Sequence, residues 1–300
     1  MVTRSLIYIT SILLLLCGAC AAQEQQPKTA QEPKTAQEPK TADEYFSRGV
    51  ERAKKAQLDA AIDDYGKAIL LNPGEARAYH NRAALKAMKG DFDGALADFS
   101  KAIAIDPNGS SAYYSRGLAY IRKGDEERAL ADFDKAISVN PKETAAYNSR
   151  AALRSKRGDY AGAVADYDKF LAAKPHVAEI YAGRGLARTA LGDYDGAIED
   201  YSKAIALRPG YASAYTHRGD AYRKRGDADA AIADYDKAIE LIPTLAEPYA
   251  NRGLARLSKG MDAAAEQDFT KALELSADLK SMIDTESNKI RQKRKAQPQP

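Results

Sequence analysis

Residues 110–143 read SSAYYSRGLAYIRKGDEERALADFDKAISVNPKE, and this stretch decides the fold of the chain. Counted from Ser110 as position 1, residues at positions 4, 7, 8 and 11 recur with the spacing of one helical face. Gly124-Asp125 interrupts this pattern, and a second helical pattern then runs until Pro141. Glycine favours helix ends, aspartate favours helix starts and proline stops helices, so the stretch predicts two helices joined by a tight turn.

The same pattern recurs along most of the chain. Prolines at 73, 107, 141, 175, 209 and 243 are each 34 residues apart. They define seven repeats over residues 42–279, which begin at Ala42, Ala76, Ser110, Thr144, Ala178, Ala212 and Ala246. In every repeat, position 4 is Tyr, position 8 is Gly or Ala, position 20 is Ala and position 24 is aromatic. Small and large residues in alternation let helices interlock, so we expect an array of stacked helical hairpins.

This pattern, with small residues at positions 8, 20 and 27, an aromatic residue at 24 and proline at 32, resembles the tetratricopeptide repeat. The resemblance implies an all-α fold, a right-handed superhelical solenoid of seven hairpins. It also implies that the first helix of each hairpin, helix A, lines a concave groove that binds proteins or peptides. Residues 280–300 are expected to form a C-terminal cap helix and a basic tail, because Leu279, Met282, Ile283 and Ile290 form a sparse apolar face that ends near residue 293.

Two repeats depart from the pattern. Phe170 occupies position 27, where the other six repeats have Ala, and a larger side chain there predicts a local change of pitch between repeats four and five. In the seventh repeat, Met261-Asp262 stands in place of Gly-Asp, and Ala277 replaces the proline. A terminal repeat is often atypical.

Two charged positions recur in all seven repeats, Arg at position 7 and Asp at position 23. Position 7 belongs to the inward face, where an unpaired Arg would be costly, so we expect the two to pair. Lys at position 26 is a competing partner for the Asp. We interpret the array as a structural charge ladder, the alternative being a ligand-binding stripe. Its central members are Arg82, Asp98, Arg116, Asp132, Arg150, Asp166, Arg184 and Asp200.

The N-terminus has the pattern of an export signal. Arg4 precedes the apolar segment 6–16, and small residues follow, so residues 1–22 predict a signal peptide. The sequence around Cys20 resembles a bacterial lipoprotein signal, which implies lipidation of Cys20 and a membrane anchor. Cleavage after Ala21 or an uncleaved anchor are the alternatives. Residues 23–41, with proline in a short tandem repeat, predict an extended spacer, and every alternative places the repeats in the cell envelope or outside the cell.

Composition and motifs argue against catalysis, metal binding and nucleic-acid binding. The chain has 45 Lys+Arg and 42 Asp+Glu, a formal charge of +3, which does not favour a nucleic-acid partner. Its two cysteines, Cys17 and Cys20, precede the repeats, and its three histidines are too far apart in the pattern to share a metal ion or a proton. The sequence lacks a phosphate-binding loop and a nucleophile elbow. We therefore expect no enzyme activity, no catalytic residue, no cofactor, no metal and no small-molecule substrate.

The groove is the predicted binding site. Positions 2, 5, 9 and 12 of helix A point away from the packed face, and in the tetratricopeptide family they line the ligand surface. The predicted patch in repeats two to four has an apolar centre and polar flanks, which suits an extended or helical peptide. It comprises Arg77, His80, Asn81, Tyr114, Leu118, Ile121 and Asn148. The family's carboxylate clamp is not expected, because no repeat has Lys at position 5 or Asn at position 9.

The basic tail supports a second hypothesis. The segment 289–295 carries five positive charges, which would attract anionic lipid or cell-wall polymer. The leading hypothesis is an envelope adaptor that recruits partner proteins through the groove. The alternative is a structural envelope protein that self-associates or binds the cell wall through this tail.

Overall fold

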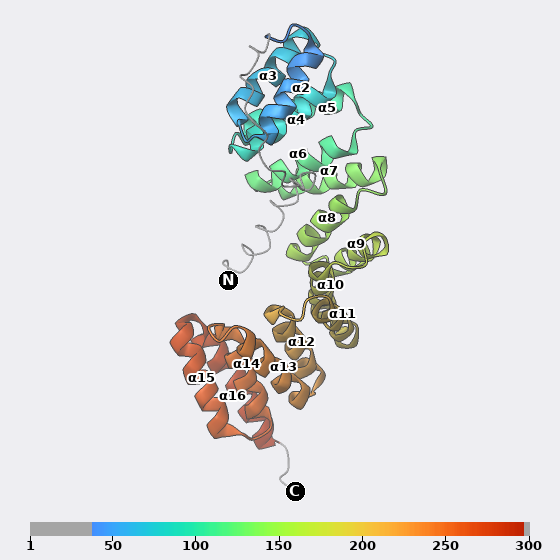
Figure 1. Ribbon diagram of the computed structural model, residues 1–300. Helices are drawn as coiled ribbons and strands as arrows, with labels where there is room; N and C mark the ends of the chain where they lie inside the picture. Colours follow the sequence, from blue (N-terminus) through green and yellow to red (C-terminus); the bar gives the residue numbers. More distant parts are fainter. Residues whose placement is uncertain (1–37, 297–300) are drawn as a thin grey trace. The chain divides into compact units, whose positions relative to one another are not determined.

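The computed structural model describes residues 38–296, and all the regular structure in that range is helical (Figure 1). The described residues from Lys40 onward form one compact unit. The predicted signal peptide, Cys20 and most of the predicted spacer lie outside the described residues. Between residues 38 and 296, no helix is long and apolar enough to cross a membrane.

Fourteen helices form seven antiparallel hairpins in chain order, and a further helix ends the array (Figure 1). The A helices are α2 (Ala42–Lys54), α4 (Ala76–Met88), α6 (Ser110–Lys123), α8 (Thr144–Lys156), α10 (Ala178–Leu191), α12 (Ala212–Arg225) and α14 (Ala246–Ser258). The B helices are α3 (Leu58–Leu71), α5 (Phe92–Ile105), α7 (Glu126–Val139), α9 (Tyr160–Ala173), α11 (Tyr194–Leu207), α13 (Ala228–Leu241) and α15 (Asp262–Leu275). A single 3-10 turn, η2 (Ala277–Leu279), leads into α16 (Lys280–Ala296). The chain is therefore an all-α solenoid of seven hairpins with a C-terminal helix, as the sequence predicts.

Each A helix begins at the residue predicted from the repeat. The turn after α6 has the predicted conformation. Gly124 has a φ of 80°, and the side chain of Asp125 accepts a hydrogen bond from the Arg128 backbone N–H at 3.0 Å. In the seventh repeat, Gly260 keeps the positive φ of 79°, whereas Met261 at the start of the next helix makes no side-chain capping hydrogen bond. The predicted departure at Met261-Asp262 was therefore wrong by one residue, because glycine is retained at position 15.

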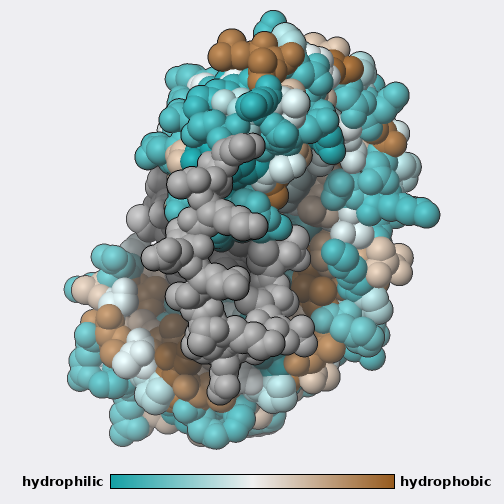
Figure 2. Space-filling model, turned by 45° about the horizontal axis from the view of Figure 1, so that its top comes forward, coloured by the Kyte–Doolittle hydropathy of each residue, from teal (hydrophilic) through white to brown (hydrophobic). Residues whose placement is uncertain are grey.

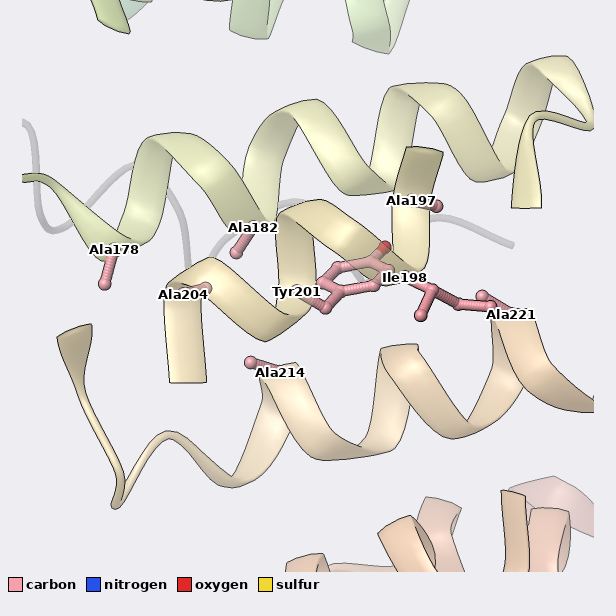
Figure 3. Close-up of a cluster of buried hydrophobic side chains, with 8 residues drawn as sticks. All are labelled: Ala178, Ala182, Ala197, Ile198, Tyr201, Ala204, Ala214 and Ala221. Atoms are coloured by element: carbon pink, nitrogen blue, oxygen red, sulfur yellow. The ribbon is translucent and has the colours of Figure 1, made fainter. Parts of the chain in front are cut away.

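The core is built from alanines that surround one aromatic ring per hairpin. Figure 3 shows Tyr201 of α11 between α10 and α12, with small side chains from all three helices around it. A Cβ added to Gly117, at position 8, would lie 2.7 Å from the Phe133 ring of the same hairpin. Position 8 therefore has to stay small because the aromatic residue at position 24 packs directly against it.

The junction between repeats four and five differs from the others. Phe170 is 8% exposed and packs with Leu171 and Ile180 in one cluster. The turn after repeat three is closed by the Glu143 N–H donating to the Asn140 carbonyl at 3.0 Å, and the turns after repeats one, two, five, six and seven close in the same way. Within the described backbone, residues 174–177 show no such bond. The change of pitch itself remains a prediction, but this turn is open where the others are closed.

Helix α16 starts 34 residues after Ala246, so it is in register with the helix A of an eighth repeat. Ile283 stands at position 4 and Ser287 at position 8, and they are 4% and 3% exposed. The helix runs to Ala296, beyond the predicted end near residue 293, so the basic residues Lys293, Arg294 and Lys295 lie in its last turn.

Candidate partner-binding groove

The Arg residues at position 7 and the Asp residues at position 23 pair inside every hairpin. Arg116 donates from Nε and Nη2 to the two carboxylate oxygens of Asp132, both at 2.8 Å, and the carboxylate is buried. The equivalent two-bond pairs are Arg48–Asp64, Arg82–Asp98, Arg150–Asp166, Arg184–Asp200, Arg218–Asp234 and Arg252–Asp268. The competing lysine at position 26 bonds elsewhere, as in Lys237–Glu240 and Lys271–Glu274. That the array is structural rather than ligand-binding stays a prediction.

The structure adds further charged members to most of these pairs, which sequence reasoning missed. Where position 11 is a cation, it also binds the Asp: Arg154 reaches Asp166 at 2.8 Å, and Arg52, Lys86, Arg188 and Arg256 do the same. In repeats four, five and seven, which have Arg at position 11, the Arg at position 7 also binds an Asp at position 25 of the preceding repeat. In repeats three and six position 11 is Tyr, and position 25 of the preceding repeat is Ser100 or Ser202. In repeats four, five and seven the extra cation is thus matched by an extra carboxylate, whereas in repeat two Lys86 has no such match, because position 25 of repeat one is Gly66.

Asp98 illustrates the balance of effects in this network. Burial opposes ionisation of its carboxyl group, but hydrogen bonds from Arg82 and Lys86 outweigh burial and lower the pKa of Asp98. The carboxylate is therefore ionised at neutral pH, and removing it would leave two cations without a counter-charge.

Three of the predicted groove residues come together on α6. Tyr114, Leu118 and Ile121 are half-buried in one apolar cluster, which rests on the buried residues Phe133 and Leu153. The ring centroids of Tyr114 and Phe133 are 5.9 Å apart. Burial raises the pKa of the Tyr114 hydroxyl group. An apolar, partly uncovered surface at the centre of the array is thus built from the residues that the sequence predicts.

The other predicted groove residues do not join this cluster. Arg77 is exposed, pairs with Glu75 at 2.8 Å, and its guanidinium lies 4.9 Å from the centroid of the Phe46 ring. Asn81 donates to the Tyr65 hydroxyl at 3.5 Å, so both residues face repeat one. His80 packs edge-on against Phe99, with ring centroids 5.4 Å apart, and its Nδ1 is buried. Asn148 is half-buried on the next A helix.

The polarity of the groove follows the residue at position 24. Repeats with Phe at this position have an apolar residue at position 12: Ala87, Ile121 and Leu257. Repeats four to six have Tyr at position 24 and Ser155, Thr189 or Arg223 at position 12. The Tyr201 hydroxyl lies 3.5 Å from Thr189 Oγ1, and in repeat one the Tyr65 hydroxyl bonds Asn81 of the next repeat. A buried hydroxyl needs a partner, so a core tyrosine brings polar residues to the groove.

Repeat six carries the most polar part of the groove. The Tyr235 hydroxyl donates to Asp220 at 2.8 Å, and the Asn251 amide donates to the same oxygen at 2.9 Å. His217 Nδ1 lies 3.9 Å from the Asp220 carboxylate. Burial and the nearby carboxylate raise the pKa of Tyr235. Sequence reasoning missed this cluster, although Asp220 is the one acidic residue at position 9 among the seven repeats.

Apolar groove residues also occur outside the predicted patch. Phe46 and Val50 line a shallow hollow on α2 together with Ser47, Arg48 and Glu51. Leu186, at position 9 of repeat five, is 43% exposed. Figure 2 shows a mainly hydrophilic surface on which hydrophobic residues gather in separate patches. The position 5 and 9 pattern could have identified Phe46 and Val50, because they are as apolar as Tyr114 and Leu118.

The groove contains no arrangement that holds a metal. Among residues 38–296, no three His, Cys, Asp or Glu side chains are grouped closely enough to bind an ion. The described groove residues offer apolar contacts in repeat three and hydrogen bonds to a carboxylate in repeat six.

Stacked hairpins with a uniform core and a variable inner face define a helical-repeat solenoid, a class of protein that presents extended binding surfaces. Three tetratricopeptide repeat family models match the chain. One matches residues 87–124, 185–222 and 219–260, and the others match 110–143 and 246–279. The chain belongs to the tetratricopeptide repeat family. No curated protein matches its sequence.

Several solved structures share the fold. The crystal structure of MamA is 29% identical, with a TM-score of 0.52, over 55% of this chain and 96% of that one. YrrB, described as a tetratricopeptide repeat protein with an unusual peptide-binding site, is 24% identical, with a TM-score of 0.57, over 60% and 92%. The C-terminal part of a repeat protein from Cytophaga hutchinsonii is 17% identical, with a TM-score of 0.66, over 80% and 98%. The last two show the fold alone.

Proposed function

We propose that this protein is a non-enzymatic adaptor of the bacterial cell envelope that binds a protein or peptide partner in its groove. One observation carries the proposal: Tyr114, Leu118 and Ile121 form a half-buried apolar cluster on α6, at the residues that line ligand surfaces in this family. Membership of a family of protein-interaction scaffolds supports binding as the activity. The core alone does not require an aliphatic pair at positions 9 and 12, since repeat four has Ala152 and Ser155 there.

The envelope location rests on the first residues of the chain. The signal pattern of residues 1–22 and the lipoprotein-like sequence at Cys20 support export and a lipid anchor, and the spacer at residues 23–41 would hold the repeats away from the membrane. Mass measurement of the mature N-terminus tests this part. A lipid-modified Cys20 is expected, and an unmodified N-terminus at Ala22 would contradict the anchor.

Partner binding is tested by crosslinking in intact cells followed by capture of the full chain. Leu118→Asp places a charge at the centre of the apolar cluster, and we expect the captured partners to be lost. Leu70→Asp is the matched control, because Leu70 is 82% exposed at the end of the B helix α3 and lies outside the groove. Partners captured equally by both variants would contradict binding at this patch.

The basic tail supports the alternative function less well. Arg291 pairs with Glu266 at 2.5 Å and Arg294 pairs with Asp262 at 2.6 Å, so two of the five cations in the segment 289–295 already bind repeat seven. Lys293 and Lys295 form no ion pair among the described residues. Changing both to Gln, rather than deleting the tail, spares Ile290 in the cap helix. Loss of cell-wall or anionic-lipid binding in that variant, with partner capture unaffected, would support a second role for the tail.

A further inference from the structure

The C-terminal helix lies on the groove side of the last repeat. Of the two helices of the preceding hairpin, each A helix from α4 to α14 contacts mainly the B helix. Helix α16 instead packs mainly against α14, which is the groove-lining helix of repeat seven. Although α16 has the register of an eighth helix A, it therefore occupies a position that a groove ligand would take.

The face turned toward α14 is a stripe that begins at Leu279 of η2 and continues along α16, and it is apolar except for the small residue Ser287. Leu279, Ile283, Ser287 and Ile290 follow the spacing i, i+4, i+8 and i+11, which keeps them on one side of a helix. The residues they cover on α14 are Ala250, Leu254 and Leu257, at groove positions 5, 9 and 12 of repeat seven, and each is 0% exposed. The chain thus contains one complete example of a helix bound on its own groove surface.

Repeat three has the same kind of surface without the covering helix. Leu118 and Leu254 share position 9, Ile121 and Leu257 share position 12, and both pairs rest on a Phe at position 24. The remaining repeats lack this combination: position 12 is polar in repeats four to six and is Ala in repeats one and two. In repeat three the groove residues are half-buried, whereas in repeat seven α16 covers them completely.

We propose that the Tyr114, Leu118 and Ile121 surface binds an amphipathic helix of a partner protein, whose apolar stripe has the spacing of α16. This inference rests on the proposed function and names the form of its ligand. A helix satisfies its own backbone hydrogen bonds, so it can lie on an apolar surface. An extended peptide would need polar partners for its backbone, and the centre of this patch is aliphatic and aromatic. The small residue at i+8 allows close approach of the two helices, as Ser287 does in α16.

The partner is a different protein rather than the α16 of a second copy. The apolar stripe of α16 is already buried on its own repeat seven. Moving it to repeat three of another chain would expose Leu254 and Leu257, so one apolar contact would be exchanged for another without gain.

The test uses the full chain and a fluorescent synthetic peptide with the sequence of residues 277–296, which carries the α16 stripe. We expect saturable binding that Leu118→Asp weakens at least tenfold, while Leu70→Asp, which is outside the groove, leaves it unchanged. Far-UV circular dichroism and thermal unfolding of each variant establish that the fold is retained. A second peptide with Ser287→Pro, which breaks the helix, is expected to lose binding.

Three results would overturn the inference. One is absence of binding by the helical peptide, and another is equal binding by the proline peptide, which would indicate an extended ligand. The third comes from a photo-crosslinking version of the peptide: crosslinks confined to α14 would mean exchange with the resident α16, whereas crosslinks to α6 support the proposal. If cellular partners still depend on Leu118 while the helical peptide does not bind, the proposed function stands and the helical form of the ligand is wrong.

Discussion

Repeats three and six are built alike in the core and differ in the groove. Both have Tyr at position 11, and in both the ladder Arg binds its own Asp and a Ser of the preceding repeat: Arg116 with Ser100 at 3.1 Å, and Arg218 with Ser202 at 2.9 Å. At groove positions 5, 9 and 12, repeat three carries Tyr114, Leu118 and Ile121, and repeat six carries Thr216, Asp220 and Arg223. The same scaffold therefore supports an apolar surface in one hairpin and a charged one in another.

The difference originates at one atom of the core. Phe133 in repeat three has no hydroxyl, so the surface above it can be wholly apolar, whereas the buried Tyr235 hydroxyl of repeat six binds Asp220. The residue at core position 24 and the groove residues that contact it are thus coupled. The coupling can be tested by changing repeat three or repeat six.

The largest loss of stability is expected from breaking the buried Arg–Asp pair that the two repeats share. Asp132→Ala leaves Arg116 without its counter-charge, and Asp234→Ala does the same to Arg218. Removing one partner of a buried pair costs about 3–5 kcal/mol, and we expect the lower end because each Arg keeps one edge exposed. Urea unfolding of both variants should show similar losses. An unchanged free energy of unfolding in both variants would mean that the charge ladder does not stabilise the fold.

A smaller loss of stability is expected from adding a hydroxyl group to the core aromatic residue of repeat three. Phe133→Tyr places a buried hydroxyl beside Ile121 without a partner, which costs about 1–3 kcal/mol. Adding Ile121→Thr, the residue that accompanies Tyr201 in repeat five, should recover most of the loss. A double-mutant cycle by thermal unfolding measures the coupling, and additive effects of the two substitutions would show that positions 12 and 24 are independent.

Removing the core hydroxyl of repeat six should lower the free energy of unfolding by a smaller amount. Tyr235→Phe removes one donor from Asp220, but Asn251 still donates to the carboxylate. The expected loss in the free energy of unfolding is about 0.5–1.5 kcal/mol, measured by urea unfolding. A loss as large as that of Asp132→Ala would mean that the Tyr235 hydroxyl, rather than Asn251, is the main partner of Asp220.

The smallest effect on stability is expected from the pH dependence of His80, at groove position 5 of repeat two. Burial lowers the pKa of His80 below its ordinary value of about 6.5, so the unfolded chain takes up a proton at a higher pH than the folded chain does. The unfolded state is therefore favoured as the pH falls below about 6.5, and His80 makes the free energy of unfolding decrease in that window. His80→Phe, an aromatic residue as at Phe46, should reduce the difference in melting temperature between pH 7.5 and pH 5. An identical difference in both proteins would contradict the burial of the ring.

The period of the sequence predicts the hairpins, their starting residues and the partners Arg150 and Asp166, because these depend on contacts inside one repeating unit. The role of Asp134 could not be predicted in this way, since it binds Arg150 across a junction between two repeats. The sequence pattern favoured Lys at position 26 as the competitor, one helical turn from the Asp. The observed competitor is at position 11 of the facing helix, and only the packing of helix A on helix B brings it within reach.

The candidate site was predicted in part for the same reason. Tyr114, Leu118 and Ile121 lie four and three residues apart on one helix, so helical spacing alone brings them together. Arg77 lies at position 2, and its surroundings come from the neighbouring repeat, because its guanidinium lies over the Phe46 ring. His80 lies at position 5 and packs against Phe99 of its own hairpin, as Tyr114 does against Phe133. The path of α16 over α14 depends on tertiary packing, because its register matches that of an eighth repeat.

The junction between repeats four and five has a consequence for how the array responds to force and to salt. Neighbouring hairpins are linked at their turn ends by pairs such as Lys89–Asp59, Lys123–Asp93, Lys156–Glu126, Arg225–Asp195 and Lys259–Asp229. At the fourth junction the corresponding residues are Leu191 and Ala161, and Phe170 supplies an apolar contact instead. High salt weakens exposed ion pairs and leaves apolar contacts intact. In single-molecule stretching, the force that separates the turn end of this junction should therefore change less in 1 M salt than the forces at the other junctions, while Arg184 and Asp168 still pair across it.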